Sequence, residues 1–250
     1  MPSALPSIFP LGDSALTIDI GPCIDEGYNR QALALRDRLL VHPFPGLMDI
    51  IVAYSSVSLF YDPVIVLQHN PGYREGAFAG LRQWLLSSLP SLTLPASTPP
   101  SDSGAEDRLV RIPICYGGQF GPDLEVIARD KGITPDEAVR LHSSGTYRVY
   151  MIGFLPGFSY MGKLDPRLAT PRKTRPASVP AGGVGIAGIQ TGIYPLQSPG
   201  GWPILGRTPL AQFNPAKQPP VRLAVGDQVQ FFPISRDEFI SWEDDWERLY

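Results

Sequence analysis

Hydrophobic residues in the first half of the chain alternate between a period of two and a helical period. Leu16, Ile18 and Ile20 occur at every second position, which is typical of a strand with one buried face. The complete pattern predicts a strand at 14–21, a helix at 32–39, strands at 49–54 and 56–62, a helix at 78–89 closed by Pro90, and a strand at 108–116. This β-α-β-β-α-β order is typical of the ferredoxin-like fold.

The pattern changes after Cys115. Residues 121–132 and 134–142 predict two short helices, the second with Thr134 as N-cap, Pro135 at the first helical position and Glu137 for a capping box. From Tyr147 onward, short apolar stretches alternate with Gly and Pro, and no helix is expected before the last dozen residues. This spacing predicts a closed β-barrel or a sandwich.

Residues 90–107 are rich in Pro and Ser, which is typical of a linker. We therefore expect an α+β protein with an N-terminal α/β domain at 1–107 and a β-barrel domain at 108–250. The strand at 108–116 could still complete the first domain's sheet from beyond the linker.

Composition excludes several classes of protein. A formal net charge of −3 argues against a general nucleic-acid binder, and no apolar run is long enough to span a membrane. The N-terminus lacks the pattern of a signal peptide, so we expect a cytoplasmic protein. Cys23 and Cys115 are too few for a disulfide framework, and His42 and His69 are too scattered for a metal site, so no metal is expected. Each cysteine could be a reactive thiol or a small buried hydrophobe.

Residues 183–188, GVGIAG, match the dinucleotide-binding pattern G-x-G-x-x-G. That pattern binds a pyrophosphate only where it ends a buried strand and opens a helix. A loop rich in Pro and Arg precedes Gly183, and Pro195 and Pro199 follow where the helix would run. The glycines are therefore expected to permit tight turns and close backbone packing.

Charge is distributed unevenly along the chain. Residues 166–226 contain seven Lys or Arg and no Asp, Glu, His or Cys. Such a segment could attract a carboxylate, a phosphate or an acidic partner, or it could be a solvated basic face balanced by the acidic residues at 235–247. Because the segment holds no acid or base suited to neutral pH, proton transfer would need His142, Asp165, Asp227 or another subunit.

Aromatic residues concentrate at 150–168. Phe154, Phe158 and Trp202 could line a ligand pocket with Tyr160, although aromatic residues in β folds are often simply core.

Residues 147–173 and 180–209 resemble the family of the B subunit of bacterial 5-oxoprolinase, also named for the kinase inhibitor KipI and for subunit 1 of allophanate hydrolase. The resemblance covers nearly the whole chain. It implies a C-terminal cyclophilin-like β-barrel and work with a C subunit and a third component, in the ATP-dependent opening of 5-oxoproline to L-glutamate. ATP could bind on a partner subunit, and the isolated chain is expected to be inactive. Inhibition of a sensor histidine kinase, and a carboxyltransferase or allophanate hydrolase role in urea breakdown, remain alternatives.

The substrate and product of this reaction are both carboxylates, so residue chemistry and motif position indicate an anion site. Candidates that could bind the substrate or another anion are Tyr160, Arg172, Arg175, Gln190 and Arg207. Arg207 is expected to matter most, because a guanidinium can hold a carboxylate through two hydrogen bonds. The alternative is that Arg207 braces a turn through backbone carbonyls.

Overall fold

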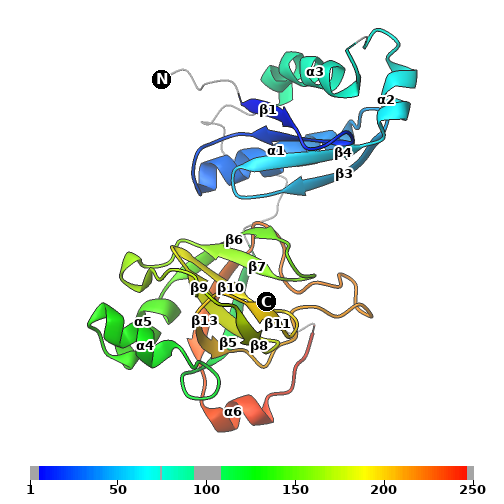
Figure 1. Ribbon diagram of the computed structural model, residues 1–250. Helices are drawn as coiled ribbons and strands as arrows, with labels where there is room; N and C mark the ends of the chain where they lie inside the picture. Colours follow the sequence, from blue (N-terminus) through cyan, green and yellow to red (C-terminus); the bar gives the residue numbers. More distant parts are fainter. Residues whose placement is uncertain (1–5, 74, 93–107, 247–250) are drawn as a thin grey trace. The chain divides into compact units, whose positions relative to one another are not determined.

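The computed structural model describes residues 6–73, 75–92 and 108–246, and the chain separates into two units, Met1–Gly104 and Ala105–Tyr250 (Figure 1). The first unit contains β1 (Ser7–Pro10), β2 (Ala15–Asp19), α1 (Glu26–Val41), β3 (Leu47–Val52), β4 (Ser56–Tyr61), α2 (Pro63–His69) and α3 (Ala77–Leu92). Its strands form one antiparallel sheet in the order β1-β2-β4-β3. Buried residues of β2 and β4 pack with Leu35 of α1 and Leu81 of α3 in a single core.

The strand at 108–116 does not complete the first sheet, which was the alternative left open by the sequence. Residues 108–116 form β5 of the second unit, and β1, which the hydrophobic pattern did not predict, pairs with β2 instead. A hairpin between neighbouring strands closes a much shorter loop than a strand returning through the segment 93–107, so its entropy cost is smaller. Because β1 buries only Ile8, it has too little alternation to be recognised.

Two helix details also differ from expectation. Pro90 does not end the second predicted helix, since α3 continues to Leu92. The additional helix α2 begins with Pro63 after Asp62, whose carboxylate accepts hydrogen bonds from the backbone N–H groups of Val64 and Ile65 at 2.8 and 3.1 Å. An N-cap Asp followed by Pro was therefore a usable signal. Most of the expected linker at 90–107 lies outside the described residues.

The second unit is built around a closed barrel, as the short apolar stretches predicted (Figure 1). Its elements are β5 (Leu109–Tyr116), α4 (Leu124–Lys131), α5 (Pro135–Ser143), β6 (Thr146–Ile152), β7 (Ser159–Gly162), the 3₁₀ helix η1 (Pro166–Leu168), β8 (Ala177–Val179), β9 (Gly183–Ala187), β10 (Gln190–Ile193), β11 (Ser198–Gly200), β12 (Ile204–Arg207), β13 (Gln228–Pro233) and α6 (Arg236–Ser241). The barrel order is β10-β7-β6-β13-β5-β12-β9, in which only β13 and β5 are parallel, while β8 and β11 form a separate two-stranded sheet.

Apolar side chains fill the barrel, which is therefore a packed core and not a channel. Ile112, Val149, Val184 and Phe231 belong to this core. The helices expected at 121–132 and 134–142 are α4 and α5, and Thr134 caps α5 by accepting a hydrogen bond from the N–H of Glu137 at 3.1 Å.

Two structural findings concern metals and membranes. Within residues 6–73, 75–92 and 108–246, no three His, Cys, Asp or Glu side chains form a group that could hold a metal ion. No helix in the same ranges is both long enough and apolar enough to cross a membrane.

Cys115 is buried in β5, where burial raises the pKa of its thiol, and Cys23 is exposed.

Candidate functional site

Gly185 of the glycine-rich motif and Gly192 of β10 lie on one face of the barrel wall. The motif lies in β9 and turns into β10 without an intervening helix, so it has no dinucleotide-binding geometry. A Cβ atom at Gly185 would lie 3.0 Å from Cβ of Trp202, and one at Gly192 would lie 3.1 Å from Cζ3 of the same residue. The two glycines thus give the barrel a flat outer wall on which Trp202 packs, as close backbone packing predicts.

Four rings meet on this wall and form what we call the aromatic cluster, namely Phe158, Tyr160, Tyr194 and Trp202. The Phe158 ring centre lies 4.6 Å from Tyr160, 4.9 Å from Tyr194 and 5.5 Å from Trp202, the last two edge to face. Val179 of β8 belongs to the same buried cluster, which is separate from the barrel core. Such arrangements stabilise beyond the area they bury.

The structure brings together the three predicted pocket-lining residues. The ring centres of Phe154 and Phe158 lie 5.8 Å apart, edge to face, and Trp202 belongs to the aromatic cluster. Phe158 and Trp202 are buried against other rings, while Phe154 is 65% exposed at the edge. Tyr194 was missed as a site residue. Its only sequence signal was its position within the family-like stretch 180–209.

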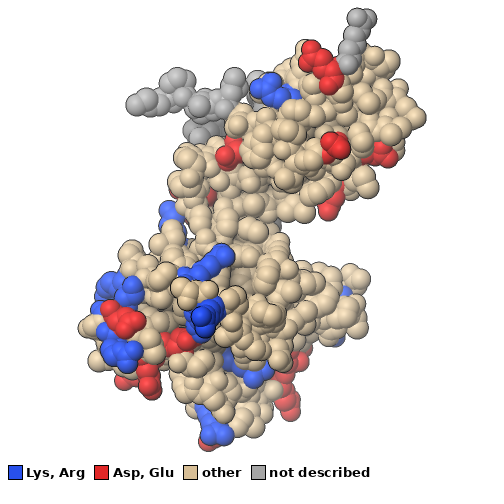
Figure 2. Space-filling view, viewed as in Figure 1, with Lys and Arg blue, Asp and Glu red and all other residues tan. Residues whose placement is uncertain are grey.

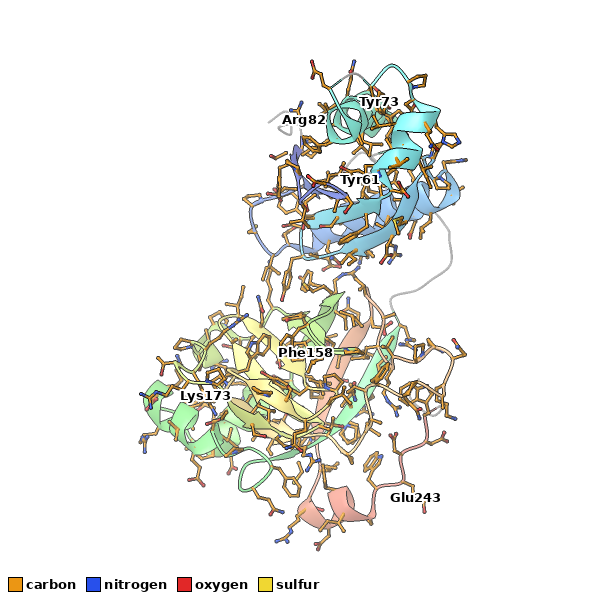
Figure 3. The ribbon with its side chains drawn as sticks, turned by 45° about the vertical axis from the view of Figure 1, so that its right-hand side comes forward. Tyr61, Tyr73, Arg82, Phe158, Lys173 and Glu243 are labelled. Atoms are coloured by element: carbon orange, nitrogen blue, oxygen red, sulfur yellow. The ribbon has the colours of Figure 1, made fainter. Side chains whose placement is uncertain are left out.

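Arg172 lies beside the aromatic cluster, with its guanidinium carbon 5.9 Å from the centre of the Trp202 ring. The backbone N–H of Lys173, which is labelled in Figure 3, donates to the carbonyl of Gly201 at 2.7 Å, and the Lys173 ammonium pairs with Asp123 at 2.6 Å. Burial raises the pKa of Tyr160, although the Arg172 charge acts in the opposite direction. The Tyr160 hydroxyl therefore keeps its proton at neutral pH and can donate a hydrogen bond near the Arg172 charge.

Three of the seven cations of the basic segment 166–226 have carboxylate partners. The carboxylate pairs are Arg167 with Asp165, Lys173 with Asp123 and Arg222 with Asp244. Arg172, Arg175 and Lys217 have no carboxylate partner among the described residues. In the view of Figure 2, basic atoms of the second unit lie in separate spots with acidic atoms among them. In this view the positive charge does not form one continuous patch. Of the cations without a carboxylate partner among the described residues, Arg172 is the one next to the aromatic cluster.

Arg207 makes the contacts expected of a side chain that stabilises a turn through a backbone carbonyl. Its Nε donates to the carbonyl of Ala181 at 2.7 Å, and its guanidinium lies 5.7 Å from the centre of the Phe239 ring. The side chains of Gln190 and Arg175 make no hydrogen bond or ion pair within the part of the chain that the structure describes. Gln190 begins β10 and Arg175 is exposed before β8, so the five candidate anion ligands do not converge on one point.

We expect Arg207→Lys to lower the free energy of unfolding by about 1 kcal/mol, because Lys cannot reproduce the Nε hydrogen bond together with the stacking on Phe239. Urea unfolding measures this change. Arg175→Lys is the matched control and should change stability by less than about 0.5 kcal/mol. Unchanged stability of Arg207→Lys, combined with a large loss of activity in a reconstituted complex, would instead identify Arg207 as a ligand.

His142 is buried at the end of α5, inside the barrel. Its Nδ1 lies 2.7 Å from the Tyr116 hydroxyl, and its Nε2 lies 2.9 Å from Oγ1 of Thr191, which in turn donates to the carbonyl of Gly185 at 3.1 Å. The Thr191 hydroxyl therefore accepts from Nε2–H, and Nδ1 accepts from Tyr116. Burial lowers the pKa of His142 to about 3, so the ring is neutral and a poor general base.

The two carboxylates considered for proton transfer are also engaged. Asp165 caps η1 and pairs with Arg167 at 2.8 Å, and these hydrogen bonds lower the pKa of its carboxyl group. Asp227 is buried and accepts from Arg108 and from the N–H of Ala224. Each of the three candidates is therefore held in internal contacts and is poorly placed to exchange a proton with a substrate.

Comparison with known proteins places this geometry in a family. The family model for the carboxyltransferase domain, subdomain C and D, matches residues 6–223. The 5-oxoprolinase B subunit of Bacillus subtilis (strain 168) is 41% identical over 236 residues, which cover 94% of this chain and 95% of the relative. The crystal structure of TTHA0988 is 36% identical with a TM-score of 0.71, covering 88% of this chain and 40% of that chain. The urea amidolyase of K. lactis, 18% identical, shares the fold with a TM-score of 0.76 over 96% of this chain and 16% of its own. The chain therefore belongs to the family of 5-oxoprolinase B subunits, within the proteins that carry carboxyltransferase subdomains C and D.

Proposed function

We propose that this chain is the B subunit of a cytoplasmic, ATP-dependent 5-oxoprolinase that opens 5-oxoproline to L-glutamate. The observation that carries the proposal is the 41% identity to a 5-oxoprolinase B subunit over nearly the full length of both chains. Its partners would be the C subunit and a third component. The TTHA0988 chain is much longer than this one, which is consistent with a unit that works beside further protein.

The aromatic cluster and Arg172 supply the chemistry we assign to this chain. Opening an unstrained lactam requires activation of its carbonyl oxygen, and ATP supplies that activation by phosphorylation. The reactant and the product both carry a carboxylate. Arg172 can pair with such an anion, and the protonated Tyr160 hydroxyl can donate a further hydrogen bond. We therefore place the substrate carboxylate at Arg172 and Tyr160 in preference to Arg207.

ATP and the acid–base groups are proposed to come from partner subunits. The glycine-rich residues of this chain form a strand under Trp202 and not a phosphate-binding loop. His142, Asp165 and Asp227 are each committed to internal hydrogen bonds. The chain by itself should therefore have no 5-oxoproline-dependent turnover.

We further infer a ferredoxin-like first unit and a cyclophilin-like barrel. In the first unit, β2 and β3 flank β4 in the sheet, as in a split βαβ arrangement, and β1 takes the outer position next to β2. The closed barrel with its packed interior supports the second assignment.

Reconstitution tests the function. The purified chain, mixed with the C subunit and the third component, should release ADP only when 5-oxoproline is present, and each component alone should not. If the complete mixture consumed ATP in a urea-dependent reaction and ignored 5-oxoproline, the carboxyltransferase alternative would replace this proposal. If it showed neither activity but the chain inhibited a sensor histidine kinase, the inhibitor role would replace it.

Within that complex, Arg172→Ala should raise KM for 5-oxoproline about tenfold, because one charge-assisted contact with the substrate carboxylate is lost. Lys217→Ala removes the same charge away from the cluster and serves as the control, with KM expected to stay within about twofold. Equal effects of the two substitutions would show that only overall charge matters and would remove Arg172 from the site.

A further inference from the structure

The residues 235–246, which we call the C-terminal strap, leave β13 through α6 and run beside the barrel, as the labelled Glu243 shows in Figure 3. Phe239 of the strap packs on Phe120 at 4.5 Å, and Trp242 lies 6.2 Å from Phe232. The capping box of Ser235 and Glu238 starts α6. Beyond α6, the strap returns to the loop around Ala211.

One carboxylate of the strap accepts hydrogen bonds from donors in the loop between β12 and β13. Oδ1 of Asp244 accepts from Nη2 of Arg222 at 2.5 Å, and Oδ2 accepts from the backbone N–H of Ala211 at 2.8 Å. Nε of Arg222 donates to the carbonyl of Ala211 at 2.6 Å, which fixes the guanidinium beside that N–H group. The Trp246 ring covers the guanidinium at 4.5 Å.

Asp244 does not satisfy all donors of this set. The Arg222 side chain is only 2% exposed, yet its Nη1 is buried and has no hydrogen-bond partner among the described residues. Asp244 uses one oxygen for Ala211 and therefore meets the guanidinium through a single nitrogen. A carboxylate that enters at a different angle can engage both Nη groups, which is the preferred pairing of arginine with carboxylates.

The strap is attached by few buried groups. None of the α6 residues is buried, and the Asp244 side chain is 26% exposed. Segments with few buried contacts open locally at low free-energy cost. Replacement of Asp244 by another carboxylate would keep Arg222 paired, so the exchange avoids leaving a buried charge alone.

We propose that Arg222 and the Ala211 N–H form a binding site for small organic carboxylates, which Asp244 occupies within the chain and which a carboxylate from solution takes over by displacing the strap. The site shares no residue with Arg172 and the aromatic cluster. It stands on the Arg222 geometry alone and does not depend on the oxoprolinase reaction. Acetate and 5-oxoproline are suitable probes, because one carries only the carboxylate and the other adds the lactam ring.

The test measures binding of acetate and 5-oxoproline to the full chain by calorimetry at constant ionic strength. Asp244→Ala removes the internal competitor, whose effective concentration on a short tether is on the order of millimolar or above. Its dissociation constant for acetate should therefore be at least about tenfold lower than that of the unmodified chain. Glu243→Ala, which removes one of the two flanking negative charges and leaves Asp244 in place, should bind like the unmodified chain. Asp244→Asn keeps the side-chain volume but loses the charge, so its gain in affinity should be smaller than that of Asp244→Ala.

A second measurement follows the strap itself. Excess acetate should accelerate hydrogen–deuterium exchange of residues 236–246 in the unmodified chain, and chloride at the same ionic strength should not. Equal acetate affinity in Asp244→Ala and Glu243→Ala, or carboxylate binding that leaves exchange of the strap unchanged, would overturn the proposal. If 5-oxoproline binds more tightly than acetate, the site also recognises the lactam ring. If the two bind equally, the site recognises the carboxylate alone. Either result is independent of whether the reconstituted complex turns over 5-oxoproline.

Discussion

Lowering the pH from 7 to 5 should cost this protein about 2 kcal/mol of stability through His142 alone. Burial lowers the pKa of His142 to about 3, whereas an unfolded histidine titrates near 6.5. The folded state therefore binds fewer protons at this position than the unfolded state. Its stabilising contribution is complete above about pH 6.5 and is lost as the pH falls toward 3.

Urea unfolding at several pH values between 7 and 5 measures this loss. His142→Gln has no titrating ring at this position and should show a correspondingly flatter dependence on pH, although it should be less stable at pH 7. His69→Gln changes an exposed histidine of α2 and should keep the slope of the unmodified chain. The same slope in all three proteins would mean that His142 is accessible to protons in the folded state.

Gly192→Ala should lower the free energy of unfolding by about 3 kcal/mol, through overpacking of the barrel wall. The added Cβ would lie 2.7 Å from the carbonyl oxygen of Ser159, 3.1 Å from Trp202 and 3.2 Å from Phe158. Neither the paired strand nor the buried rings can move without disturbing the aromatic cluster. Denaturant unfolding measures the loss, and near-ultraviolet circular dichroism should report altered packing of the rings.

Gly153→Ala is the control for that substitution. Its Cβ would meet only the end of the Met151 side chain, at 3.6 Å, so stability should change by less than about 0.5 kcal/mol. A Gly192→Ala protein as stable as the control would show that Trp202 does not pack on the wall as described.

The barrel unit was the more predictable half of the fold. Its strands are short, Gly and Pro separate them, and α5 carries an N-cap at Thr134, so local signals agree with the final structure. The first sheet was less predictable, because its edge strand β1 buries only Ile8, while the strand at 108–116 pairs with β13 in the barrel.

The candidate site was predictable in composition but not in arrangement. Phe158, Tyr160 and Trp202 lie in one cluster, as their concentration in family-like stretches indicated. Arg207 was expected to be the principal anion ligand, yet its guanidinium is engaged with Ala181 and Phe239. Sequence spacing carries no information about such partners, since they come from the turn before β9 and from α6.

Local sequence was sufficient to narrow the second unit to a barrel or a sandwich, to reject a dinucleotide fold at residues 183–188 and to identify the family. Each of these depends on periodicity, on turn residues or on long matching stretches. Which cations are unpaired and which titratable groups are internal emerged only from the packed chain. Lys173 is paired because the N-cap of α4 places Asp123 beside it, and His142 is neutral because it is buried between Tyr116 and Thr191. Ion pairing and desolvation depend on neighbours within a few ångströms in space, and the fold brings those neighbours from distant parts of the chain.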